Sequence, residues 1–189
     1  MSTAPVHVLP KIVSDAPTLD DLAAFRYRPM TFVNLLLEGR GHLADVVVWT
    51  PGDEFPYFRL TEAPLSMPLQ APAGKTIVTA DIGCELGDEI WTADDDELGR
   101  MCLDSLERIV PGISRHHLGT RVVRTPLAYP VYLLEYEERR AEFTKSTGVD
   151  GLLSIGRNGE FAHILMEDVY WRTHHRVHQW AEETATSAV

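Results

Sequence analysis

The clearest candidate for chemistry is the segment from Gly156 to Phe161, which reads GRNGEF. Its two glycines flank Arg157 and Asn158, and they let the backbone turn sharply and approach a ligand closely. A helix is predicted to begin just beyond, near residues 166–168, so that its first N–H groups point towards the segment. Such a helix end stabilises negative charge, for example on a phosphate or on the electron-rich edge of a cofactor. A plain strand-to-helix turn would produce the same pattern.

Histidines form the second candidate group. His174, His175 and His178 lie in one predicted helix, and His174 and His178 are one turn apart, a spacing at which two imidazoles can share a metal ion. The sequence offers no evident third ligand and no H-E-x-x-H pattern, so we predict no metal site there and a solvated helix face is the simpler interpretation. The adjacent pair His116 and His117 lies in a predicted loop and has the same simple interpretation.

Two arginines and four aromatic residues could form a ligand cleft above a sheet. Arg59 and Arg124 could each hold a carboxylate through two hydrogen bonds, and a salt bridge within this acid-rich chain is the alternative. The aromatic residues either line that cleft or pack in the core; they are Trp49, Tyr57, Phe58 and Trp91. The sequence has no nucleophile motif such as G-x-S-x-G, so the catalytic residues stay unassigned.

The elements that would position these residues are mostly strands. Runs of apolar residues bounded by glycine and proline predict strands over residues 6–9, 31–37, 44–49, 57–61, 75–84, 121–125, 131–134 and 152–155. Helices are predicted over residues 94–110, 136–144 and 167–184, the first with Thr92 or Asp94 as its N-cap.

This order of elements indicates an α+β fold with a mixed, largely antiparallel sheet and flanking helices. We expect an N-terminal arm over residues 1–20, one domain over residues 21–184 and a frayed tail over residues 185–189.

The composition and charge of the chain exclude some classes of protein. The chain has 189 residues and a formal net charge of −11, which repels nucleic acid. No apolar run approaches the length of a membrane span, and the first residues lack the features of a signal peptide. The two cysteines, Cys84 and Cys102, are expected to be free thiols. These features predict a cytoplasmic protein that binds neither nucleic acid nor membrane.

Two ordered motifs give the chain a family resemblance. The first, close to R-x-x-x-A-Y-P-x-Y, consists of Arg124, Ala128, Tyr129, Pro130 and Tyr132; the second consists of Gly156, Arg157, Gly159, Phe161 and Met166. Together they resemble the closing segment of the flavin-dependent amine-oxidase-type superfamily, which holds protoporphyrinogen oxidase and UDP-galactopyranose mutase. The resemblance covers roughly residues 6–175 and includes the family's substrate-binding sheet, with residues 6–13 as the strand just before it.

The resemblance implies FAD as cofactor and a small-molecule substrate. It assigns cofactor binding to Gly156, Arg157, Gly159, Phe161, Met166, Glu167 and Asp168, and substrate binding to Arg59, Trp91, Arg124 and Tyr129. The family pattern is broken at three positions, where His163, Leu165 and Glu167 replace its Tyr, Asn and Asp.

The family's dinucleotide fingerprint G-x-G-x-x-G is missing from this sequence. We therefore expect half of a split FAD-dependent oxidoreductase, with a Rossmann-type flavin-binding partner subunit. One alternative is a flavin-free protein that binds a small ligand or acts as a cyclase or isomerase. Another is a homo-oligomeric interaction module, because a surface meant for a missing domain would expose apolar residues.

Overall fold

The computed structural model describes residues 1–187 and divides the chain into two compact units. Unit 1 comprises residues 1–27 and 129–189, and unit 2 comprises residues 28–128. These limits do not coincide with the predicted boundaries at residues 20 and 184. The predicted tail is helical as far as Ser187, and its last two residues lie outside the described part of the chain.

Unit 2 is built on a five-stranded sheet in the order β2-β3-β4-β1-β5. The strands are β1 (Tyr27–Glu38), β2 (Val47–Trp49), β3 (Arg59–Thr61), β4 (Lys75–Gly83) and β5 (His117–Pro130). The long central pair β1–β4 is antiparallel, from Met30 opposite Gly83 to Glu38 opposite Lys75, and β3 is antiparallel to both β4 and β2. The predicted α+β class with a largely antiparallel sheet is thus confirmed.

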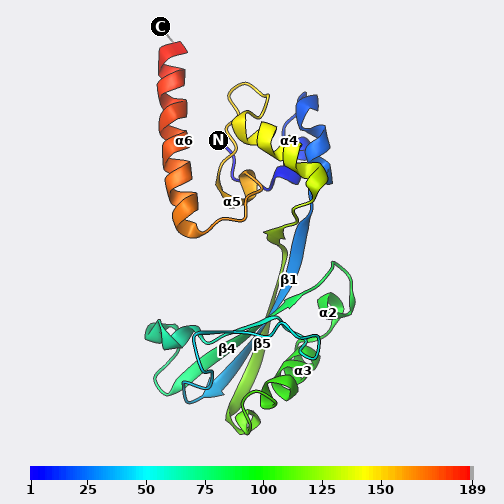
Figure 1. Ribbon diagram of the computed structural model, residues 1–189, viewed down its shortest axis with the longest axis vertical. Helices are drawn as coiled ribbons and strands as arrows, with labels where there is room; N and C mark the ends of the chain where they lie inside the picture. The colour runs from blue at the N-terminus through cyan, green and yellow to red at the C-terminus, as the bar shows by residue number, and fades with distance from the viewer. Residues whose placement is uncertain (188–189) are drawn as a thin grey trace. The chain divides into compact units, whose positions relative to one another are not determined.

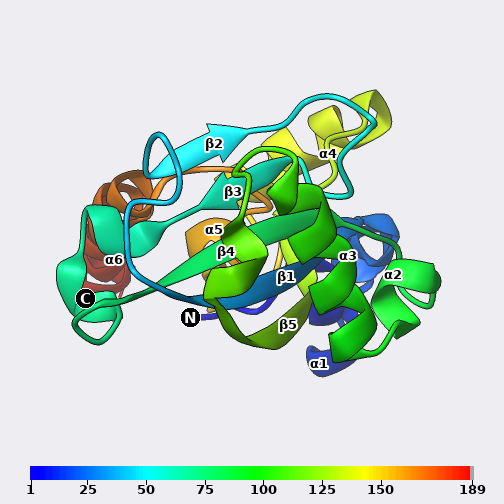
Figure 2. The ribbon, with the colours of Figure 1, turned by 90° about the horizontal axis from the view of Figure 1, so that it is seen from below.

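One face of this sheet is covered by helix α3 (Asp95–Glu107) (Figures 1 and 2). The Asp94 carboxylate caps its start by accepting the Glu97 N–H at 2.7 Å, as predicted. Alternate residues of β1 and β4 point to the helix, because side chains alternate between the two faces of a strand. The resulting core joins strand residues Val33, Leu35, Leu60, Val78 and Ala80 to helix residues Leu98, Cys102 and Leu106.

The remaining elements of unit 2 are short. Helix α2 (Glu89–Thr92) precedes α3, and 3-10 turns occur at Ala63–Leu65, Pro68–Gln70 and Ile113–His116. Two separate strands were predicted around Pro126, but β5 runs through it and ends at Pro130. This is possible because β5 is an edge strand, where proline costs no hydrogen bond on the open side. Residues 131–134 form no strand.

Unit 1 consists mainly of helices: α1 (Leu9–Ile12), α4 (Leu134–Lys145), α5 (Gly156–Gly159) and α6 (Met166–Ser187), with 3-10 turns at Val6–Val8 and Pro17–Ala24 (Figure 1). The predicted strand over residues 6–9 is wrong. Pro5 and Pro10 favour a turn and a helix start there, and the turn buries Val6 and Leu9. The predicted helices over residues 136–144 and 167–184 are confirmed by α4 and α6.

The predicted strand over residues 152–155 is also wrong, although part of its hydrogen bonding exists. Ser2 forms a single parallel bridge with Ser154, in which the Ser2 N–H donates to the Leu153 carbonyl and the Ile155 N–H donates to the Ser2 carbonyl. Residues 152–155 thus pair with the amino terminus at one bridge only, and no strand forms.

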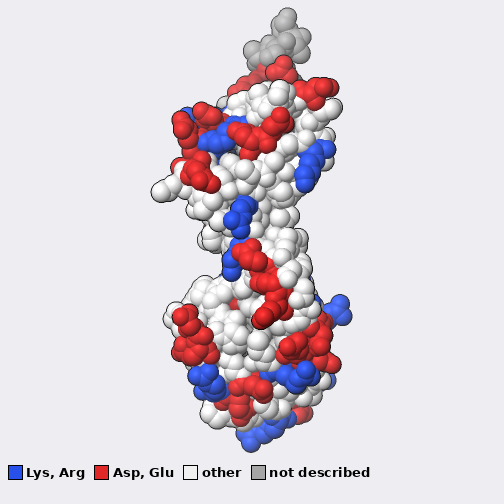
Figure 3. Space-filling view, turned by 90° about the vertical axis from the view of Figure 1, so that its right-hand side faces the viewer, with Lys and Arg blue, Asp and Glu red and all other residues white. Residues whose placement is uncertain are grey.

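Charged side chains are mixed on the surface. The face shown in Figure 3 carries acidic residues interspersed with basic ones. Within residues 1–187, every helix is too short or too polar to cross a lipid bilayer.

Candidate functional site

The two motifs that carry the family resemblance meet within unit 1. The Arg157 guanidinium lies 5.4 Å from the centre of the Tyr129 ring and donates through Nη1 to the Ile164 carbonyl at 3.0 Å. The His163 ring packs edge-on against Tyr129 with 5.1 Å between ring centres. The His163 N–H also donates to the Tyr132 hydroxyl oxygen at 2.5 Å. Residues 129–132 and 156–165, distant in sequence, therefore form one assembly.

Phe161 anchors this assembly in the core. Its side chain is fully buried and its backbone is left-handed, with φ of 49°. Its ring contacts those of Phe25, Tyr27, Tyr132 and Tyr136 at centre distances of 4.7 to 6.3 Å. The Phe161 side chain, predicted to bind cofactor, thus has a packing function in this structure.

The segment GRNG, predicted to make a sharp backbone turn, forms the single helical turn α5. Gly156 adopts φ of 81°, a conformation that favours glycine. A side chain at Gly159 would lie 3.0 Å from Ser154 Oγ and 3.3 Å from the Ser2 carbonyl oxygen. The close backbone approach predicted at this glycine is therefore made to the chain's own amino terminus.

Glu160, which sequence reasoning missed, ties this turn to α6. Its carboxylate is only 1% exposed and lies 2.8 Å from Arg172 Nη2 and 3.4 Å from Arg176 Nη1. It also accepts the Gly156 N–H at 3.2 Å. The spacing of Arg172 and Arg176, one helical turn apart, was the signal available in the sequence.

The amino end of α6 is open. Leu165 and Met166 are 74% and 90% exposed, and Glu167 and Asp168 are exposed in the first turn. The Asp168 carboxylate accepts the Leu165 N–H at 3.2 Å. The partial positive charge of a long helix's amino end suits an electron-rich ligand edge, while these two acids already offset part of it. The exposed backbone therefore fits such a group, and its two acidic side chains do not favour an anion.

The uncovered face of the unit 2 sheet carries Arg59. Its guanidinium pairs with Asp81, which is 2% exposed, and lies 5.5 Å and 5.9 Å from the ring centres of Trp49 and Phe58. Burial raises the pKa of the Asp81 carboxyl above its ordinary value, and Arg59 acts in the opposite direction. Arg59 Nε is buried without a hydrogen-bond partner, while the Arg59 side chain as a whole is 28% exposed.

The other predicted substrate residues of unit 2 have structural contacts. Arg124 donates through Nη2 to the Ala93 carbonyl at 2.6 Å and through Nη1 to the Asp95 carboxylate at 3.1 Å, which fixes the start of α3 to β5. Trp91 lies in α2, and its backbone N–H donates to the capping carboxylate of Asp88 at 2.7 Å. Substrate binding by Arg124 and Trp91 stays a prediction. Tyr129, the fourth residue of that group, belongs to unit 1.

A buried carboxylate fills a potential anion site after β1. The Glu62 carboxylate accepts the N–H groups of Gly41, His42 and Leu43 at 2.7 to 2.9 Å and the Thr76 hydroxyl at 2.9 Å. Residues 39–44 read GRGHLA, a loose form of the dinucleotide fingerprint, but no helix follows them. Because the chain's own carboxylate takes these N–H groups, this turn is no phosphate site.

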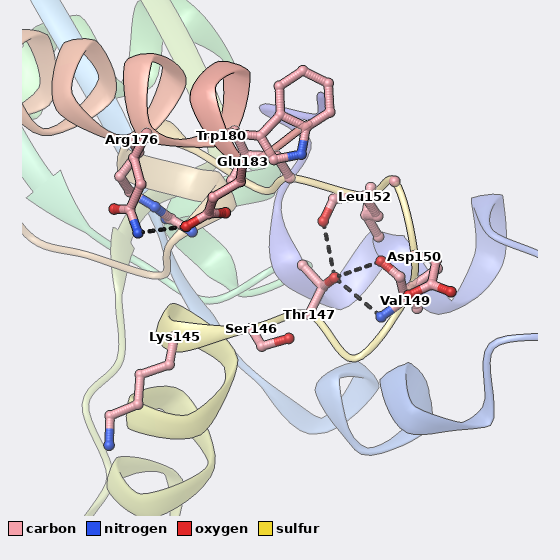
Figure 4. Close-up of a pocket in the computed structure, with 12 residues that line it drawn as sticks. Lys145, Ser146, Thr147, Val149, Asp150, Leu152, Arg176, Trp180 and Glu183 are labelled. Carbon is pink, nitrogen blue, oxygen red and sulfur yellow. Dashed lines mark hydrogen bonds between the residues drawn. The ribbon is translucent and has the colours of Figure 1, made fainter. Parts of the chain in front are cut away.

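Unit 1 also has a polar pocket between α6 and the loop after α4 (Figure 4). Arg176, Trp180 and Glu183 line one side, and residues 145–147 and 149–153 line the other. The Thr147 hydroxyl holds this loop by donating to the Leu152 carbonyl at 2.9 Å. No sequence motif pointed to this pocket.

The cysteines and histidines add no further reactive centre to the predicted site. Cys84 and Cys102 are free and buried, and burial raises the pKa of the Cys102 thiol to about 12. Within residues 1–187, His, Cys, Asp and Glu side chains form no group of three or more suited to a metal ion.

Comparison with known proteins gives the fold. No protein-family model and no curated protein matches the sequence. Among solved structures, the chain is similar to a reduced UDP-galactopyranose mutase, with a TM-score of 0.68 and 15% identity over 84% of this chain. It is also similar to a protoporphyrinogen oxidase-like protein from Exiguobacterium sp. 255-15, with a TM-score of 0.64 and 16% identity over 82% of this chain.

Both names belong to the superfamily that the sequence motifs resemble. The match covers 35% of each of these two chains, so this chain spans about a third of their length. At such low identity the similarity establishes a shared fold and does not transfer an activity. The chain therefore has the fold of part of these two proteins.

Proposed function

We propose that this chain is a subunit of a split FAD-dependent oxidoreductase. The observation that carries the proposal is the fold shared with part of the UDP-galactopyranose mutase chain, a match that covers 84% of this chain with a TM-score of 0.68. The part without a counterpart would come from a partner chain with a dinucleotide-binding fold. The missing G-x-G-x-x-G fingerprint favours the same division.

In this proposal the assembly of residues 129–132 and 156–168 lies against the flavin. Arg157 and Phe161 hold the loop in shape, and Glu160 fixes α6 so that its amino end presents backbone N–H groups. When bound, FAD supplies the redox chemistry, hydride acceptance from a C–N or C–C bond. The backbone at Met166, Glu167 and Asp168 would stabilise the electron-rich edge of the ring.

For the substrate, we propose binding at the uncovered face of the unit 2 sheet. Arg59 offers a partly exposed guanidinium, paired with Asp81, beside the aromatic rings of Trp49 and Phe58. Such a group suits a small substrate with both an acidic and a flat apolar part.

A flavin-free function is the second candidate. The family pattern is broken at His163, Leu165 and Glu167, and two acids in the first turn of α6 disfavour an anionic ligand. A protein that binds a small ligand, or a cyclase or isomerase that needs no redox cofactor, would be compatible with these changes.

The test is a visible absorbance spectrum of the chain alone and after co-purification with the product of the neighbouring gene. We expect a flavin band only in the co-purified complex. The variant Arg157→Ala should lower the flavin-to-protein ratio, because the loop loses its contact with Ile164, whereas Arg100→Ala on the exposed side of α3 should not.

Absence of flavin from every complex with a G-x-G-x-x-G protein would refute the proposal. A colourless chain that binds a small ligand saturably would support the flavin-free candidate. Light scattering on the isolated chain would show whether self-association takes the place of a partner.

A further inference from the structure

Helix α6 brings two histidine rings into contact on an exposed surface. His174 and His178 are one turn apart, their ring centres are 4.4 Å apart, and both residues are exposed. Residues at this spacing lie above one another on one face of a helix. Small side-chain rotations would let a nitrogen of each ring reach one metal ion at about 2.0–2.1 Å.

The ring nitrogens of this pair are not otherwise engaged. Across residues 1–187, neither ring takes part in a hydrogen bond or an ion pair, and their contacts are with other rings. The other close histidine pair in the chain differs in this respect. His42 Nε2 is 2.9 Å from the Glu38 carbonyl oxygen, and His116 Nε2 accepts a hydrogen bond from Arg115 at 3.2 Å.

The sequence alone predicts no metal site at these histidines, because it shows no third ligand. From the contact of the two rings we propose instead that His174 and His178 together bind a divalent transition metal ion of the class that imidazole prefers, Zn²⁺ or Cu²⁺. The two imidazoles supply two ligands, and water fills the other positions, because the described residues provide no third ligand within such a group. A site of this kind binds more weakly than a four-ligand structural zinc site. It follows the order of metal affinities that favours Cu²⁺ over Zn²⁺.

Metal binding at this pair would stabilise α6. From Met166 to Glu183 no residue of the helix is fully buried, so its order rests on half-buried contacts and on the ion pairs of Arg172 and Arg176 with Glu160. A metal ion that joins one turn to the next binds the helical form more tightly than the unfolded one, and it therefore shifts the equilibrium towards helix. Both proposed ligands belong to this chain, so the site can be tested without flavin or a partner chain.

His175 provides the matched control. It is exposed on the same helix and lies next to His174, but it is rotated by about 100° around the helix axis. Its ring meets that of His174 edge-on with 5.8 Å between ring centres. Replacing it removes one imidazole from the chain without separating the proposed pair.

The experiment is calorimetric titration of the intact chain, free of any histidine tag, with Zn²⁺ and with Cu²⁺. We expect one site, tighter for Cu²⁺, that is weakened at least about tenfold in His174→Ala and in His178→Ala. His175→Ala should bind each metal with an affinity within about twofold of that of the parent chain.

Far-ultraviolet circular dichroism should show more helix with Zn²⁺ in the parent and in His175→Ala only. Equal loss in all three variants, unchanged binding in His174→Ala and His178→Ala, or no binding by the parent would each overturn the proposal.

Discussion

At the scale of single residues, two opposing effects act on the pKa of Asp81. Burial raises the pKa of its carboxyl above the ordinary value of 3.8, and the smaller effect of Arg59 lowers it. Because the pKa of Asp81 is higher in the folded chain than in the unfolded chain, its contribution to folding stability is full below pH 3.8 and falls as the pH rises through the folded pKa.

Removing the guanidinium in Arg59→Met should raise the Asp81 pKa further, as measured by NMR titration of the side-chain carboxyl. Arg59→Lys keeps the charge and should leave the pKa nearer that of the parent; a lower pKa in Arg59→Met would contradict this account.

The ion pairs of Glu160 lead to a prediction about the stability of the chain. Its buried carboxylate lies between Arg172 and Arg176, which are only partly buried. Glu160→Gln leaves these two cations without a counter-charge, and we expect a loss of about 2 kcal/mol in the free energy of unfolding after allowing for solvent screening. Urea unfolding would measure it. The exposed Glu167→Gln should change stability by less than about 0.5 kcal/mol; equal effects would show that Glu160 does not hold α6.

At the scale of elements, Gly99 permits the close approach of α3 to β5. A side-chain carbon at this position would lie 2.6 Å from Thr120 Oγ1 and 2.9 Å from its Cγ2. Gly99→Ala adds about 1 kcal/mol of helix propensity, but the overlap should cost about 1–3 kcal/mol and lower the midpoint of thermal unfolding. Thr120→Ala removes both atoms, so the double variant should recover much of the loss. Gly119→Ala in β5, with nothing within 4 Å, is the control. A stabilised Gly99→Ala chain would mean that the two elements separate easily.

The elements also show which features the sequence could predict. Helix α3 was predictable because it has a capping carboxylate, an apolar stripe and a Pro-Gly end within one stretch. The β1–β4 pair was predictable because its strands are long apolar runs. The strand predictions for residues 6–9 and 152–155 were wrong because short apolar runs fit a turn or a strand equally well. The conformation of residues 152–155 depends on the pairing of Ser154 with Ser2, which no local pattern encodes.

The candidate site could be predicted from the sequence only in part. Motif order indicated that residues 129–132 and 156–168 act together, and the contacts of Arg157 with Tyr129 and Ile164 join them. The burial of Phe161 and the ion pairs of Glu160 depend on three-dimensional packing, so the sequence could not separate side chains that bind a ligand from those that support the loop. Whether the named residues bind a cofactor stays a prediction.

At the scale of the whole molecule, each unit has a hydrophobic core of its own. Every residue of the main core lies within residues 28–128, from Val33 to Ile113. Unit 1 is organised around Phe161 and its aromatic neighbours, all of which belong to residues 1–27 or 129–189. Because unit 2 is a single continuous stretch and unit 1 is not, only unit 2 can be isolated by trimming both ends of the chain.

We therefore predict that residues 28–128 fold without unit 1. The fragment keeps all five strands but for the ends of β1 and β5, and it keeps the helix that covers their core. It should unfold cooperatively on heating, and its amide NMR signals should overlay those of the same residues in the full chain away from the cut ends. Leu35→Ala should lower the stability of the fragment and of the full chain by a similar amount, about 2–5 kcal/mol, because its contacts are internal to unit 2. A fragment without dispersed NMR signals would mean that unit 2 needs unit 1 to fold, and the two cores would then have to be treated as one cooperative structure.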